Sequence, residues 1–83
     1  MDNFKNLTDL ELGYNSLTTA GIVPLKKLTN LKTLIINNNS ISSFASLSTL
    51  THLNSLYVTG NTTTNYTPFK GIYKNLVYRD FTI

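Results

Sequence analysis

The amino-acid sequence predicts an α/β solenoid: a right-handed coil with a short-stranded parallel sheet on its concave face and 3₁₀ or extended segments on its convex face. Two observations lead to this fold class, the composition and the phase of the apolar residues. Leu, Thr and Asn, with 13, 13 and 11 copies, make up 37 of the 83 residues, a bias that favours internal repeats. Apolar residues recur in one phase along nearly the whole chain. The chain has no cysteine, so neither a disulfide nor a thiolate zinc site can stabilise it.

Sliding the chain against itself reveals three copies of one template, LxxLxLxxNxL, which start 24 and then 22 residues apart. The copies consist of Leu7, Leu10, Leu12, Asn15 and Leu17; Leu31, Leu34, Ile36, Asn39 and Ile41; and Leu53, Leu56, Val58, Asn61 and Thr63. This spacing is neither that of a helix face nor that of a long strand. We therefore interpret each copy as one turn of a coil with mixed secondary structure.

Each turn is expected to contribute one short strand. Residues 9–12, 33–36 and 55–58 alternate inward aliphatic side chains with variable outward ones, as a half-buried strand does. Because the phase is the same in each copy, the strands should lie parallel, and a parallel crossover is right-handed in nearly all proteins. The return path is too short for a long α-helix with two turns, so 3₁₀ or extended segments are expected there.

The three copies, each with Asn at the same position, resemble the leucine-rich repeat, and the LTNL and LTHL junctions are similar to those of bacterial internalins. This resemblance covers nearly the whole chain and implies one leucine-rich repeat domain over residues 1–83. The expected bounds are a partial repeat 1–6, repeats 7–30, 31–52 and 53–75, and a degenerate terminal turn 76–83.

The first repeat and the terminal turn depart from the template. Residues 20–24 hold two extra residues, which we expect to form a loop bulge on the convex side. If Leu76 opens the terminal turn, a fourth strand lies near Tyr78 to Phe81 and Arg79 stands where a core leucine belongs. The aromatic residues of this turn are expected to shield the last face of the core.

The other end of the chain begins in the middle of a repeat, since Phe4 and Met1 fall on late template positions. Repeat arrays need polar ends because each unit buries its face only against its neighbours. We therefore expect this chain to be the C-terminal part of a longer array. The alternative is edge-to-edge self-association through the uncapped first coil, because an unpaired strand edge is a template for another chain.

The repeated asparagines Asn15, Asn39 and Asn61 are interpreted as a structural ladder. Each follows the last inward strand residue by three, where backbone groups lose their strand partners. A carboxamide turned inward can satisfy those groups, one rung per coil. Ligand binding by these amides is the alternative that the pattern favours less.

The outward side chains of the strands define a concave face. Ile35 and Tyr57 should lie adjacent and exposed there, bordered by polar residues, which is typical of a small protein-binding patch. The alternative is that they are only strand formers and cross-strand neighbours. The candidate binding residues are Asp9, Glu11, Tyr14, Lys32, Thr33, Ile35, Asn37, Ser55, Tyr57 and Thr59.

No catalytic, metal or cofactor site is predicted. Asp9 and Glu11 face the same side, as an acid–base pair or a cation site requires, but the next strands do not repeat them, which favours a solvated acidic spot. His52, the single histidine, has no nucleophile and acid placed around it. The glycines form no phosphate-binding motif.

Neither nucleic-acid binding nor membrane insertion is predicted. The formal charge of +3 comes from scattered bases, not from a basic stripe with interleaved aromatics. No stretch is apolar and long enough to span a membrane, and the N-terminus has no apolar signal core.

The resemblance implies a non-catalytic module that binds a protein or peptide on its concave face, within a bacterial surface or secreted protein. A cytoplasmic location is the alternative. A second function that stays open is the recognition or regulatory arm of a larger enzyme, such as a ubiquitin ligase or a phosphatase complex. A truncated array without function is a third.

Overall fold

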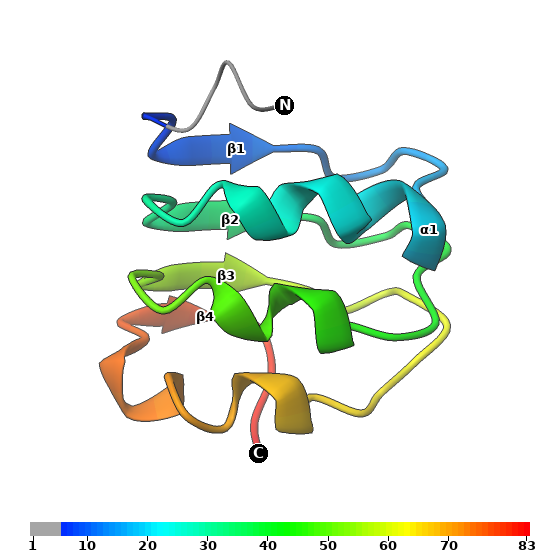
Figure 1. Ribbon diagram of the computed structural model, residues 1–83. Helices are drawn as coiled ribbons and strands as arrows, with labels where there is room; N and C mark the ends of the chain where they lie inside the picture. The colour runs from blue at the N-terminus through cyan, green and yellow to red at the C-terminus, as the bar shows by residue number, and fades with distance from the viewer. Residues whose placement is uncertain (1–5) are drawn as a thin grey trace.

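A computed structural model describes residues 6–83, in which a parallel sheet lies opposite a series of short helical turns (Figure 1). The strands are β1 (Asp9–Glu11), β2 (Thr33–Ile35), β3 (Ser55–Tyr57) and β4 (Tyr78–Arg79), in the order β1-β2-β3-β4. The return segments hold α1 (Thr19–Ile22) and the 3₁₀ helices η2 (Val23–Lys27), η3 (Ala45–Thr49), η4 (Thr67–Phe69) and η5 (Tyr73–Asn75). The predicted solenoid with short strands and 3₁₀ segments is confirmed.

The partial repeat expected over 1–6 lies outside the described residues except for Asn6. The same holds for Phe4 and Met1, on which the expectation of an uncapped first coil depended.

The register of the sheet aligns the repeated leucines. Leu10 lies beside Leu34, and Leu34 lies beside Leu56, in three consecutive parallel strands. Because side chains alternate along a strand, this register directs all three leucines to the same side of the sheet. The prediction that the coils share one phase is therefore confirmed.

The leucines and their neighbours fill one apolar interior between the sheet and the helical turns. Leu34, Ile36, Leu56 and Val58 have no exposed surface, and burying one such side chain stabilises a protein by roughly 1.5 to 3 kcal/mol. The first coil is less enclosed: partly buried residues pack against the core there, and they are Leu7, Leu10, Leu12 and Leu17.

The extra residues of the first repeat form a helical turn, so the prediction of a loop bulge was wrong. The hydroxyl of Thr18 accepts a hydrogen bond from the backbone N–H of Gly21 at 3.2 Å and so caps α1. Pro24 then lies at the start of η2, where its missing N–H is no loss. Ile22 is fully buried, which shows that the helical turn absorbs the insertion without losing the apolar phase.

Asn39 joins two coils. Its Oδ1 accepts the backbone N–H groups of Asn15 and Leu17, both at 3.1 Å, and its Nδ2 donates to the carbonyl groups of Leu12 at 3.0 Å and Ile36 at 2.9 Å. The carboxamide therefore satisfies backbone groups of its own coil and of the coil before it, at the point where both chains leave the sheet.

Asn61 bonds in the same way one coil later, since its Oδ1 accepts the N–H groups of Asn39 at 3.2 Å and Ile41 at 3.1 Å. Asn15 does not follow the prediction: it is exposed, and its Nδ2 donates to the carbonyl of Gly13 at 3.1 Å. Asn39 bonds to backbone groups of the coil before its own. Asn15 has no such partner in the described residues, because those before it belong to its own coil.

The terminal turn closes the interior with aromatic and cationic side chains. Arg79 lies opposite Leu56 in the sheet, as predicted, but its guanidinium carbon lies 4.4 Å from the ring centre of Tyr73 and its Nη1 donates to the carbonyl of Leu76 at 3.3 Å. Phe81 is buried. The fourth strand ends at Arg79, whereas the sequence had suggested Phe81.

Candidate binding face

Two rows of outward side chains cross the concave side of the sheet. Neighbours in such a row lie on strands about 4.8 Å apart and contact each other. The first row consists of Asp9, Thr33, Ser55 and Tyr78, and the second consists of Glu11, Ile35 and Tyr57. The register therefore brings seven outward side chains together, of which all but Tyr78 are candidates from the sequence.

An apolar strip lies on the β3–β4 side of these rows. Ile35 and Tyr57 are adjacent, as expected, but half-buried, which corrects the expectation that both are exposed. Neighbours in the sheet cover part of each side chain. Val77 and Tyr78, next to them in the closing turn, are more open, with exposed fractions of 68% and 61%. We call Ile35, Tyr57, Val77 and Tyr78 the aromatic strip.

Sequence reasoning missed Val77 and Tyr78 as binding candidates because they lie in the turn that departs from the template. One signal could have found them. If Leu76 is aligned with Leu53, the next two positions correspond to Asn54 and Ser55, which precede and begin a strand on the concave face.

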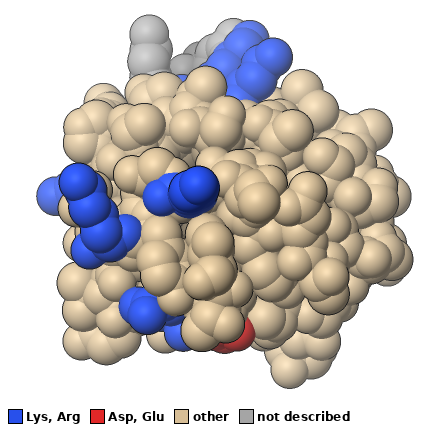
Figure 2. Space-filling model, turned by 90° about the horizontal axis from the view of Figure 1, so that it is seen from below, with Lys and Arg blue, Asp and Glu red and all other residues tan. Residues whose placement is uncertain are grey.

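Charged side chains gather at opposite ends of the sheet. Asp9 and Glu11 stand exposed on β1, and neither carboxylate has a hydrogen-bond or ion-pair partner in the stretch 6–83. The closing segment carries the bases Lys70, Lys74 and Arg79. Figure 2 shows the molecule from the β4 end, with Lys and Arg side chains spread over this face and acidic surface at its rim.

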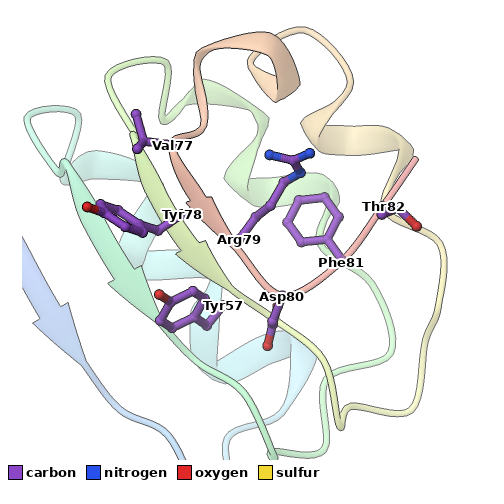
Figure 3. Close-up of a pocket in the computed structure, with 7 residues that line it drawn as sticks. All are labelled: Tyr57, Val77, Tyr78, Arg79, Asp80, Phe81 and Thr82. Atoms are coloured by element: carbon purple, nitrogen blue, oxygen red, sulfur yellow. The ribbon is translucent and has the colours of Figure 1, made fainter.

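An open hollow of about 590 Å³ lies at the β4 end of the sheet (Figure 3). In Figure 3 Tyr57 and Tyr78 project from one side of the sheet, whereas Arg79 and Phe81 lie on the other side of β4. The lining residues are Tyr57, Val77, Tyr78, Arg79, Asp80, Phe81 and Thr82. Side chains from both faces of β4 therefore contribute to the hollow, together with the residues that follow this strand.

Tyr14 has an unusual backbone. It is 79% exposed and adopts φ 58°, in the left-handed region. The equivalent residues of the next two coils are Asn38, with φ 57°, and Gly60, with φ 81°. Asn and Gly are the residues that tolerate this conformation, whereas a bulky side chain there is strained. The first coil thus retains an aromatic side chain at a position that favours other residues.

The remaining candidates differ in how free they are to bind a ligand. The hydroxyl of Thr59 donates to Asp80 Oδ2 at 2.6 Å, so this hydroxyl is already bonded to the terminal turn. The Oδ1 atom of Asn37 is buried and has no hydrogen-bond partner. Lys32, just before β2, is exposed. Thr33 and Ser55 are half-buried between their strand neighbours.

His52 Nδ1 lies 3.0 Å from the carbonyl oxygen of Thr29 in the convex junction. Between Asn6 and Ile83, no cluster of three or more His, Cys, Asp or Glu side chains could hold a metal ion. Within the same range no helix has the length and apolarity that a membrane span requires.

The parallel sheet, the repeated leucine register and the asparagine ladder define a leucine-rich repeat solenoid. A family model described as Leucine rich repeat matches residues 5–62, and the chain belongs to this family. A comparison with curated proteins gave no match.

Among solved structures, the chain is similar to an internalin C2 of Listeria monocytogenes, with 27% identity and a TM-score of 0.84 over 98% of this chain and 34% of that one. It is also similar to an internalin (inlF) of the same species, with 28% identity and a TM-score of 0.84 over 95% of this chain and 22% of that one. The chain is thus an internalin-like leucine-rich repeat that spans about a third or less of the length of these proteins.

Proposed function

We propose that this chain is a protein- or peptide-binding module that holds its ligand on the concave face and has no catalytic role of its own. The observation that carries the proposal is the aromatic strip. Ile35, Tyr57 and Tyr78 come from three neighbouring strands and lie beside polar residues of the same rows, and Val77 directly precedes β4. Apolar and aromatic anchors within a polar rim are the usual anatomy of a protein interface.

The sheet itself supports this function. Parallel sheets are normally covered on both faces, but here only the convex side carries helical turns in the part of the chain that the structure describes (Figure 1). The uncovered face holds Tyr78 and Val77, whose burial by a partner would remove apolar surface from water at about 25 cal/mol per Å². A ligand on the concave face would supply the missing layer.

The similarity to internalins supports the context of the module. We place it in a bacterial surface or secreted protein, and we retain the repeat bounds 7–30, 31–52 and 53–75 with a terminal turn 76–83 as part of this proposal. The concave residues expected to contact the ligand, besides the aromatic strip, are Asp9, Glu11, Tyr14, Lys32 and Thr33.

Selection of binders from a random peptide library on the 83-residue chain tests the proposal. Each selected peptide is then measured by isothermal titration calorimetry against Tyr57→Ala, Tyr78→Ala and a convex control, Ser48→Ala, which is exposed on η3. We expect both tyrosine variants to weaken binding at least tenfold and Ser48→Ala to leave it unchanged. Peptides that bind all three variants equally would place the binding surface away from the concave face and contradict the proposal.

A further inference from the structure

The outer edge of β4, the last strand of the sheet, has no strand partner in the described residues. The N–H of Tyr78 donates to the carbonyl of Asn54 at 3.1 Å. Because main-chain groups alternate in direction along a strand, the N–H and C=O of Arg79 point to the outer edge. Such groups are a template for another extended chain.

The hollow described above lies beside β4. It is lined on the concave side by Tyr57 and Tyr78, and beyond β4 by Arg79 and Phe81 (Figure 3). Val77, at the start of the edge, is largely exposed. A chain that pairs with β4 would place alternate side chains on the two faces of the sheet, with Tyr57 and Tyr78 on one face and Arg79 on the other.

The charges around β4 indicate which kind of peptide would bind to its edge. Between Thr67 and Ile83 the bases are Lys70, Lys74 and Arg79 and the single acid is Asp80. The carboxylate of Asp80 already accepts a hydrogen bond from the backbone N–H of Val58 at 2.9 Å. The bases therefore outnumber the acid, which favours an acidic ligand.

Arg79 is positioned to bind a carboxylate. Its guanidinium is held over the ring of Tyr73 and uses Nη1 to donate to the carbonyl of Leu76. A guanidinium has five N–H donors, so further donors remain for a ligand. An arginine that is already oriented by an aromatic ring loses less rotamer freedom when it binds.

We propose that the edge of β4 binds an extended acidic peptide segment as a fifth strand. The main chain of the segment bonds to the N–H and C=O of Arg79, and one of its carboxylates bonds to the Arg79 guanidinium. An apolar side chain of the segment enters the hollow beside Tyr78. Main-chain pairing of this kind is a general mode of peptide recognition. The hollow shares Tyr57, Val77 and Tyr78 with the aromatic strip, but the main-chain and guanidinium contacts at Arg79 belong to the edge site alone.

Fluorescence anisotropy with the 83-residue chain tests this inference. The probe is a labelled eight-residue peptide in which Glu alternates with Val, and its counterpart has Lys in place of Glu. We expect the Glu peptide to bind at least tenfold more tightly than the Lys peptide. We also expect its affinity to fall as salt is raised from about 50 to 300 mM, because the Debye length shortens. Equal affinities for the two peptides would overturn the inference.

Variants at Arg79 separate the main-chain contact from the side-chain contact. Arg79→Gln keeps the outward N–H and should weaken binding about threefold, whereas Arg79→Pro removes it as well and should weaken binding at least tenfold. Proline is tolerated on an edge strand where the N–H faces solvent, and circular dichroism checks the fold of each variant. The control Lys26→Gln removes the same charge from the convex side and should have no effect.

Three results would contradict the fifth-strand site. The first is an unchanged affinity of Arg79→Pro for the Glu peptide. An unchanged affinity of Arg79→Gln counts in the same way if, in a nuclear magnetic resonance titration, the amide shift of residue 79 also stays unaltered. The second is an equal loss in Lys26→Gln. The third is self-association of the free chain through this edge in sedimentation equilibrium. Concave-face peptides selected as above should still bind Arg79→Pro, so failure of this inference is distinguishable from failure of the proposed function.

Discussion

The carboxylate of Asp80 accepts a hydrogen bond from the backbone N–H of Val58 at 2.9 Å. One coil earlier, the equivalent N–H of Ile36 bonds to the main-chain carbonyl of Tyr57, also at 2.9 Å. Asp80 Oδ2 also accepts from the hydroxyl of Thr59 at 2.6 Å. A side-chain carboxylate thus replaces the strand carbonyl in the last coil, which ends the sheet ladder and leaves β4 short.

Replacement of Asp80 by Ala should lower the free energy of unfolding by about 1 to 3 kcal/mol, because the N–H of Val58 then lacks its partner. Asp80→Asn keeps an acceptor and should lose less. Urea denaturation measures both. The matched control is Asp9→Ala on β1, whose carboxylate has no partner in the described residues and whose loss should change stability by less than about 0.5 kcal/mol. Equal effects of Asp80→Ala and Asp9→Ala would contradict this role of Asp80.

The two ends of the asparagine ladder should respond differently to truncation. Asn39→Ala removes the partner of backbone groups in two coils and should destabilise the protein by about 1 to 3 kcal/mol. Asn15→Ala removes one exposed hydrogen bond and should stay within about 0.5 kcal/mol of the parent chain. Thermal or urea unfolding of the two variants checks this difference, and a large loss in Asn15→Ala would restore the original prediction of three equivalent rungs.

Stability should decline in alkaline solution through Tyr66. Burial, and secondly the charge of Asp80, raise the pKa of Tyr66 above its usual value of 10.0. The folded state therefore holds this proton more tightly than the unfolded state does. The stabilisation is fully present below pH 10.0 and is lost as the pH rises toward the folded-state pKa. Urea unfolding of the parent chain and of Tyr66→Phe between pH 8 and 11 measures it, and parallel pH profiles would exclude a contribution of Tyr66.

Relief of the left-handed conformation at Tyr14 should stabilise the chain. A left-handed backbone costs most side chains roughly 1 to 2 kcal/mol, but Asn adopts it readily. Tyr14→Asn should therefore raise the free energy of unfolding by about 0.5 to 1 kcal/mol. The same change should weaken peptides that contact the first coil. A variant that is less stable than the parent would show that the Tyr14 side chain makes a packing contribution larger than the strain.

The regular part of the fold could be predicted because its information is local and repeated. Leu10, Leu34 and Leu56 occupy one position in three copies of a template, and identical phase permits one parallel register. The outward residues Ile35 and Tyr57 follow from the same alternation. Their partial burial could not be predicted, because it depends on how side chains of neighbouring strands lean over one another.

The departures from regularity could not be predicted because they depend on long-range partners. Thr18 can be recognised as the N-cap of α1 only once the inserted residues are known to form a helical turn. Asn15 has the sequence context of Asn39 but lacks a described coil to bond back to. Asp80 directly follows Arg79, the last paired residue of the sheet, and nothing in the template indicates that its carboxylate replaces a main-chain carbonyl.

The most direct test of concave-face binding compares two adjacent residues of β3 that point in opposite directions. Leu56 is fully buried and Tyr57 is half-buried on the concave side. Leu56→Ala should lose about 2 to 5 kcal/mol of stability as a core truncation, whereas Tyr57→Ala should lose less than about 1 kcal/mol. The decisive measurement is the affinity of folded Tyr57→Ala for the library-selected peptides. We predict a loss of at least tenfold, about 1.4 kcal/mol, and an unchanged affinity would contradict binding on the concave face.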